Sequence, residues 1–110
     1  MKSYKTIEDG KIVIVIRGEM GFEDRAVFWS YIKDFQDSEI DYMLIELSGL
    51  EFIDSAGMAL LLNANEQIAG LGKKITLKHP IGQVSKMFYV SRMSDILEVI
   101  EAPEDKPESA

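Results

Sequence analysis

The sequence contains no cysteine, only one histidine and only three prolines in 110 residues. The lack of cysteine excludes disulfide bonds, thiol catalysis and thiolate metal sites. The single histidine, His79, gives no metal-binding spacing, and its place before Pro80 favours a loop role over a catalytic one. The signatures of P-loops, dinucleotide-binding turns and Gly-x-Ser-x-Gly elbows are also missing. We therefore expect a protein that is not an enzyme and that carries neither a cofactor nor a metal ion.

Positive charge and long apolar runs are scarce as well. The chain has 12 Lys and Arg against 19 Asp and Glu, a net charge of −7 that would repel nucleic acid. Lys73, Lys74 and Lys78 form a small basic cluster that is more typical of a solvated strand than of a nucleic-acid site. No apolar stretch reaches the roughly 18 residues of a membrane span, and the first eight residues lack the apolar core of a secretion signal. We expect a cytoplasmic protein without a transmembrane segment or bound nucleic acid, present as a monomer or a weak dimer.

Length and composition indicate one compact domain. A chain of 110 residues with 46% hydrophobic side chains can bury a single core. Residues 102–110 differ from the rest, because they contain two prolines and three acidic residues and have nothing to bury. We expect a domain over residues 1–101 and a disordered acidic tail over residues 102–110.

Two short segments near the N-terminus predict a β-hairpin. Residues 4–8 and 11–17 flank Asp9-Gly10, a dipeptide that tolerates the positive φ angles of a tight turn. Residues 12–16 are all Ile or Val, and such an unbroken run is typical of a strand that is covered on both faces. Residues 11–17 should therefore form a central strand of a layered sheet.

The rest of the chain alternates between helical and strand patterns. Residues 22–35 have a helical period, with Phe28, Ile32 and Phe35 facing the sheet and Trp29 beside them, either semi-buried or in contact with a partner. The elements expected after it are a strand over 41–47, a helix over 56–70 closed by the glycines of 70–72, a strand over 73–78, a helix over 82–90 with Val84, Met87 and Phe88 as its apolar side, and a turn or edge strand over 96–100.

A strand, a helix and a strand of these lengths predict a parallel crossover. The fold class is therefore α/β: a mixed sheet of four to five strands, with an antiparallel N-terminal hairpin and parallel βαβ units, packed against about four helices. The loop before the helix over 56–70 then lies at the carboxyl end of the sheet, where open α/β sheets place their binding sites.

The segment Asp54-Ser55-Ala56-Gly57 begins that helix and is the candidate site. Asp and Ser are preferred N-caps because a side-chain oxygen accepts a hydrogen bond from a free amide of the first turn, but one such residue suffices. Glycine inside a first turn is costly, and apolar residues at 50, 52 and 53 pin the preceding loop. A rigid loop, a free hydroxyl and a slim first turn together suggest a surface that another molecule approaches closely.

Phosphorylation of Ser55 would add about −1.5 to −2 charges at neutral pH. The positive end of the helix dipole and the free amides would tolerate this phosphate, so the domain should stay folded. A partner packed against residues 54–58 would instead meet a bulky dianion beside Asp54, and binding would be switched without unfolding. The same helix end could alternatively hold the phosphate of a nucleotide, although the loop offers no basic side chain.

Residues 47–57, LSGLEFIDSAG, and the order of the expected elements closely resemble the STAS domain, named for sulfate transporters and anti-sigma factor antagonists. The resemblance is greatest to its free-standing bacterial antagonists. The family pattern D-L-S-G-V-x-F-I-D-S-S/A-G-L is kept with mild variants at Glu46, Leu50 and Met58. Residues 18–20 are similar to the family's Gly-x-Leu, and residues 93–97 to its closing Leu-x-x-Ile-Phe. The resemblance implies one STAS domain over residues 1–101.

In such antagonists the matching serine is phosphorylated by a partner that is both a serine kinase and an anti-sigma factor. The unphosphorylated antagonist binds that partner and frees the sigma factor. The resemblance therefore implies partner switching with an anti-sigma factor kinase and a phosphatase, and phosphorylation at Ser55. It also implies that the partner-binding residues are Asp54, Ser55, Ala56, Gly57 and Met58.

One departure from the family pattern supports an alternative. Many members carry an acidic residue directly after Gly-x-Leu, near the partner's nucleotide, whereas this chain has Gly21 there, followed by Glu23 and Asp24. The alternative is a STAS scaffold, or a binding subunit of a signalling assembly or membrane transport system, that does not use a phosphorylation switch.

Overall fold

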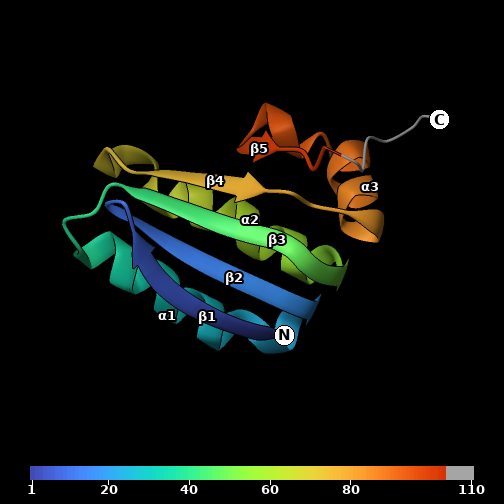
Figure 1. The fold of residues 1–110 in the computed structure, drawn as a ribbon, viewed down its shortest axis with the longest axis horizontal. Helices are drawn as coiled ribbons and strands as arrows, with labels where there is room; N and C mark the ends of the chain where they lie inside the picture. The colour runs from blue at the N-terminus through green and yellow to red at the C-terminus, as the bar shows by residue number, and fades with distance from the viewer. Residues whose placement is uncertain (104–110) are drawn as a thin grey trace.

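A computed structural model describes residues 1–103 as one mixed sheet with three α-helices. The elements are β1 (Lys2–Glu8), β2 (Lys11–Met20), the 3-10 helix η1 (Phe22–Asp24), α1 (Arg25–Asp37), β3 (Tyr42–Ile53), α2 (Ser55–Ile68), η2 (Ala69–Leu71), β4 (Lys74–Lys78), α3 (Gly82–Ser91), η3 (Met93–Asp95) and β5 (Glu98–Ile100). The strand order is β1-β2-β3-β4-β5, with β1 antiparallel to β2 and all other neighbours parallel (Figure 1). The predicted α/β class is confirmed, but with three α-helices and short 3-10 helices in place of about four helices.

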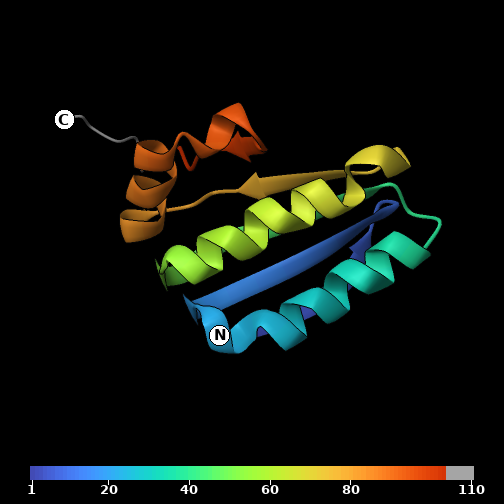
Figure 2. The same ribbon diagram turned by 180° about the vertical axis from the view of Figure 1, so that it is seen from behind.

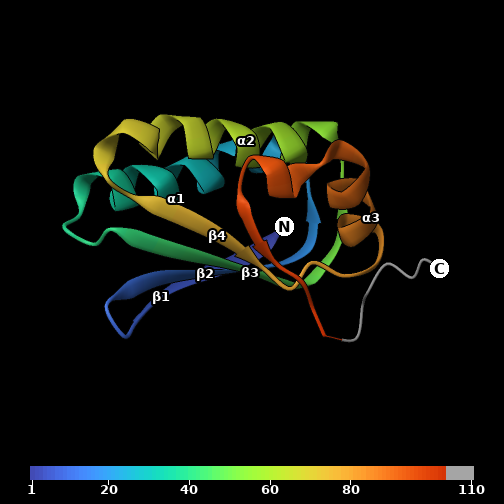
Figure 3. The ribbon, with the colours of Figure 1, turned by 90° about the horizontal axis from the view of Figure 1, so that it is seen from above.

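Helices α1 and α2 lie side by side on one face of the sheet (Figures 2 and 3). The strands contribute to this face the fully buried side chains Ile14, Ile16, Met43, Ile45, Leu47 and Leu77. No helix within residues 1–103 covers the opposite face, on which Val15 is half-buried (Figure 3). The prediction that both faces of residues 12–16 are covered by other layers is therefore wrong. Val13 is nevertheless buried, because it lies between the neighbouring strands β1 and β3.

The predicted hairpin is confirmed. Its turn consists of Asp9, with φ 51°, and Gly10, with φ 78°, and Glu8 faces Lys11 across it. Positive φ angles at both turn residues match the twist of the two flanking strands.

Strands β2 and β3 extend beyond the predicted residues 11–17 and 41–47. They end at Met20 and Ile53, and their extra residues pair with each other through two shifts in register, so that Arg17 faces Gly49 and Met20 faces Ile53. Such irregularities bend a strand without ending it. Residues 48–53, which the sequence predicts as a loop, thus belong to the sheet, and their end positions the start of α2.

The helical faces agree with the sequence pattern. Helix α1 buries Phe28, Ile32 and Phe35, although it begins at Arg25 because η1 precedes it. Trp29 is half-buried, and its ring packs edge-on against Phe28 with centroids 5.7 Å apart. The semi-buried packing role predicted for Trp29 is thus the one observed.

The C-terminal half follows the predicted order. Helix α2 continues as η2 and ends at Gly72, which has φ 74°. Helix α3 buries Val84 and Phe88 and leaves Met87 partly buried, and β5 forms an edge of the sheet. Of the tail predicted to be disordered, residues 104–110 lie outside the described residues.

Candidate functional site

Asp54 is the N-cap of α2. Its Oδ1 accepts a hydrogen bond from the Gly57 N–H at 2.8 Å, and its carbonyl oxygen accepts one from the Met58 N–H at 2.9 Å. Asp54 thus performs alone the capping role that the sequence allows to either Asp54 or Ser55. Ser55 is the first residue of the helix, is exposed, and has a hydroxyl with no hydrogen-bond partner among residues 1–103.

The first turn of α2 also has unused donors. The amides of Gly57 and Met58 bond to Asp54, whereas the amides of Ser55 and Ala56 have no partner in the described part of the chain. These two N–H groups lie at the positive end of the helix dipole. An anionic group on the Ser55 oxygen would therefore lie beside two free donors.

Gly57 and Met58 lie beneath this surface. Both are buried, and Met58 is only 6% exposed. A Cβ on Gly57 would stand 2.6 Å from the Met20 carbonyl oxygen and 2.7 Å from Ile53 Cγ1. The group that approaches Gly57 closely in this structure is therefore the end of β2, and the role of Gly57 and Met58 in binding a partner stays a prediction. The accessible part of the predicted surface is residues 54–56.

Gln83 of α3 holds the end of β3, and no motif in the sequence indicated this role. Its Oε1 accepts a hydrogen bond from the Ile53 N–H at 2.9 Å, and its Nε2 donates to the Ile53 carbonyl oxygen at 2.9 Å. β3 has run past the end of β4 here, since their last pair is Glu46 with Lys78. The difference in length between β3 and β4 is the signal that could have pointed to such a role, because backbone groups at the end of the longer strand need other hydrogen-bond partners.

Gly21 lies directly against the cap of α2. A Cβ on it would stand 2.8 Å from Asp54 Oδ2, and its N–H donates to Asp24 Oδ2 at 2.8 Å. The ammonium group of Met1 lies 2.9 Å from Asp24 Oδ1. Burial raises the pKa of Asp24, but the hydrogen bond from Gly21 and the Met1 ammonium lower it more, so the pKa lies below its usual value. Asp24 is thus engaged, whereas the nearby carboxylates of Glu19, Glu23 and Asp54 are exposed and form no ion pair within residues 1–103.

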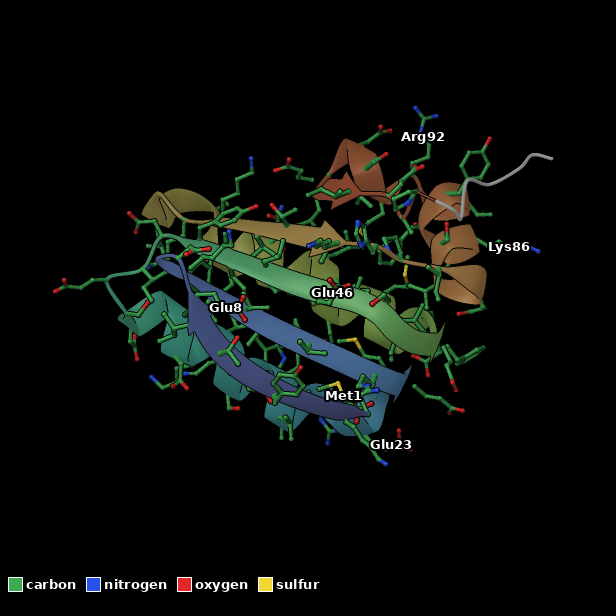
Figure 4. The ribbon with its side chains drawn as sticks, viewed as in Figure 1. Met1, Glu8, Glu23, Glu46, Lys86 and Arg92 are labelled. Carbon is green, nitrogen blue, oxygen red and sulfur yellow. The ribbon has the colours of Figure 1, made fainter. Side chains whose placement is uncertain are left out.

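The surface around the cap is acidic and carries two exposed aromatic rings. Phe22 is 61% exposed and Phe52 is 44% exposed. Met1 and Glu23 lie at the same end of the molecule (Figure 4). The residues that line the hollow here are Met1, Glu19, Met20, Gly21, Glu23, Asp24, Phe52 and Asp54. Exposed aromatic rings of this kind commonly mark an interaction surface.

Residues 1–103 give little support for metal binding, for a membrane-spanning helix or for a catalytic role of His79. No three His, Asp or Glu side chains come together so that they could bind a metal ion. No helix in this range has both the length and the apolar character needed to cross a bilayer. His79, with φ 59°, donates its backbone N–H to the Ile100 carbonyl oxygen, which is a structural role in a loop.

Replacing Asp54 by alanine should lower the free energy of unfolding by about 1 kcal/mol, because the Gly57 amide loses its cap. Asp54→Asn is the matched control, since its side-chain oxygen can still accept that hydrogen bond. We expect Asp54→Asn to retain most of the stability in urea denaturation. Equal losses in both variants would show that the charge of Asp54, and not its capping hydrogen bond, stabilises α2.

Known proteins resemble this chain in sequence. The family model described as "Mlab, STAS domain" matches residues 4–99. A protein of Thermotoga neapolitana, named as a homologue of the candidate anti-sigma factor antagonist TM1081, is 23% identical over 100 residues. That alignment covers 90% of this chain and 88% of the relative.

Solved structures share the fold. The crystal structure of TM1081 from Thermotoga maritima, a candidate anti-sigma factor antagonist, has a TM-score of 0.80 at 19% identity and covers 93% of this chain and 88% of its own. The anti-sigma factor antagonist SpoIIAA in its unphosphorylated form has a TM-score of 0.73 at 17% identity and covers 94% and 91%. At such low sequence identities, the similarity to these two structures shows a shared fold and no more.

Proposed function

This chain belongs to the STAS domain family, whose model spans residues 4–99, and on this basis we propose that it is an anti-sigma factor antagonist that works by partner switching. In its unphosphorylated form it binds an anti-sigma factor that is also a serine kinase. Phosphorylation of Ser55 releases it, and a phosphatase restores the binding form. The protein is a cytoplasmic binding module and not an enzyme.

The observation that carries the proposal is the state of the Ser55 hydroxyl. It is exposed and bonded to no other described residue, because Asp54 supplies the cap of α2. A kinase can therefore modify it without breaking a contact of the fold. The free amides of Ser55 and Ala56 and the helix dipole then compensate part of the added negative charge.

The surroundings of Ser55 indicate what its partner resembles. Phe22 and Phe52 offer exposed aromatic area, and the carboxylates of Glu19, Glu23 and Asp54 line the same hollow as Phe52. A complementary partner has an apolar pocket with a basic rim. Once bound, that partner covers the start of α2, where a phosphate of about −1.5 to −2 charges would be both desolvated and crowded.

Binding of Ser55 variants to the cognate anti-sigma factor tests the switch. We expect Ser55→Ala to bind like the unmodified protein, and Ser55→Asp to bind at least about tenfold more weakly because of the charge at the interface. Mass spectrometry after incubation with this partner and ATP should find the phosphate on Ser55. The phosphorylated protein should keep its thermal midpoint while it loses affinity.

Ser94→Asp is the matched control, because Ser94 is also exposed at the start of a short helix but lies in η3. Its affinity should stay unchanged. Equal affinity of Ser55→Ala and Ser55→Asp, or a phosphate found on another residue, would contradict partner switching through Ser55.

A second candidate is a STAS binding subunit without a phosphorylation switch. It is favoured by Gly21, because the Asp54 carboxylate fills the space that the acidic side chain expected from the family pattern would need. Mass spectrometry separates the two functions: a subunit without the switch acquires no phosphate on Ser55 when it is incubated with its partner and ATP.

A further inference from the structure

Strand β1 is one edge of the sheet and has an unused side. Among residues 1–103 it pairs only with β2. Because the two-residue turn closes on the Glu8–Lys11 pair, hydrogen-bonded pairs alternate from there, and every second residue of β1 turns its backbone N–H and C=O away from β2. The outward-facing residues are Ser3, Lys5 and Ile7. Within residues 1–103, no backbone hydrogen bond joins them to another segment.

This edge has little protection against pairing with another strand. It is seven residues long, without a proline or a shift in register, whereas β5 at the opposite edge has three residues. Short edge strands, prolines, bulges and charged side chains are the usual protections, and β1 has only the charged side chains of Lys2, Lys5 and Glu8. Tyr4 is 52% exposed and Ile7 is 63% exposed, so the edge also offers apolar area.

The edge is complementary to itself. If a second copy of β1 runs antiparallel about a twofold axis at Lys5, then Lys2 of each copy faces Glu8 of the other, and Tyr4 faces Thr6. Neither Lys2 nor Glu8 has an ion-pair partner within the described residues, and the two lie at opposite ends of β1, where Figure 4 labels Glu8 and the neighbouring Met1. Lys2–Glu8 and Tyr4–Thr6 are the non-hydrogen-bonded pairs of this arrangement, and in such pairs the side chains approach each other most closely.

The centre of this arrangement brings two Lys5 side chains together. Each of them already has Asp34 of α1 as an ion-pair partner at 3.4 Å, so the lysine charges are accompanied by two carboxylates. The Tyr4 rings of the two copies lie diagonally across the junction, within the reach of aromatic side chains. The twofold axis stands perpendicular to the sheet, so the helical layers of both copies remain on the same side.

We propose that the outer edge of β1 is a homodimer interface, in which two copies pair their β1 strands antiparallel about Lys5 and form one continuous sheet. The interface is isologous and therefore closed, so association stops at the dimer. The inference is independent of the function proposed for Ser55.

Charge reversal tests both the interface and its register. In sedimentation equilibrium of the full chain up to about 1 mM, we expect a reversible dimer. Lys2→Glu and Glu8→Lys should each weaken it by about tenfold or more, because each places like charges opposite one another twice. An equimolar mixture of the two variants should restore the dimer as a heterodimer, since the carboxylate introduced at position 2 of one variant then faces the ammonium group introduced at position 8 of the other.

Lys86→Glu is the control for net charge, because Lys86 is exposed on α3 and forms no ion pair within residues 1–103. It should dimerise as the unmodified protein does. Amide exchange of Ser3, Lys5 and Ile7 should slow as the protein concentration rises. A protein that stays monomeric at about 1 mM overturns the proposal, and so does a dimer that neither single reversal weakens or that the mixture fails to restore.

Discussion

Replacing Gly57 by alanine is expected to lower the free energy of unfolding by about 2 kcal/mol, although alanine is the better helix former. The new Cβ would stand 2.6 Å from the Met20 carbonyl oxygen and 2.7 Å from Ile53 Cγ1. Overpacking of this kind costs about 1 to 3 kcal/mol, and the upper end applies because a backbone oxygen cannot rotate away. The gain in helix propensity returns about 1 kcal/mol.

Gly70→Ala is the matched control for Gly57→Ala. Gly70 lies in η2, where an added Cβ meets nothing within 4 Å, so its replacement should leave the stability unchanged or raise it by up to about 1 kcal/mol. Urea denaturation of both variants measures the difference through their midpoints. If Gly57→Ala is as stable as Gly70→Ala, the start of α2 can move away from β2 without cost.

Replacing Gln83 by alanine should lower the free energy of unfolding by about 2 kcal/mol, the second large effect. The side chain makes two hydrogen bonds to Ile53, which is fully buried, and its removal leaves a backbone donor and an acceptor without partners. Each unsatisfied buried group costs about 1 to 3 kcal/mol, and partial access of water lowers that sum. Hydrogen exchange of the Ile53 amide should accelerate in step with the loss.

Gln67→Ala provides the comparison for Gln83→Ala. Gln67 is exposed on α2, and its side chain donates within the described part of the chain only to the Gln36 side chain, at 3.3 Å. Its removal should change the stability by less than about 0.5 kcal/mol. A loss for Gln83→Ala that is no larger than this would mean that water replaces its hydrogen bonds to the end of β3.

The fold could be predicted from the sequence wherever a residue acts through its neighbours in the chain. Asp9-Gly10 set the hairpin, and Phe28, Ile32 and Phe35 set the buried face of α1, because turn and helix chemistry are local. The end of β3 could not be predicted in this way. Residues 48–53 contain Ser48-Gly49 and the acidic Glu51, and they stay in the sheet because β2 continues beside them.

The candidate site shows the same division. A cap at Asp54 or Ser55 follows from residue type and spacing, and the structure places it at Asp54. The need for glycine at position 57 comes from the Met20 carbonyl oxygen, which is distant from it in the chain. The role of Gln83 comes from its hydrogen bonds to Ile53, which is also distant from it in the chain. A sequence pattern can mark such positions as unusual, but the group that occupies the nearby space becomes known only from the fold.

The contacts at the ends of β2 and β3 also bear on how fast a partner can bind. The Met20 carbonyl accepts a hydrogen bond from the Asp54 amide at 3.3 Å, Gly57 packs against the same carbonyl, and Gln83 holds the last residue of β3. Strand ends and helix start are thus one preformed unit. An incoming protein needs to order little backbone here, so the conformational entropy that this chain loses on complex formation is small. Association should accordingly be governed by diffusional encounter and orientation, not by a conformational rearrangement of this chain.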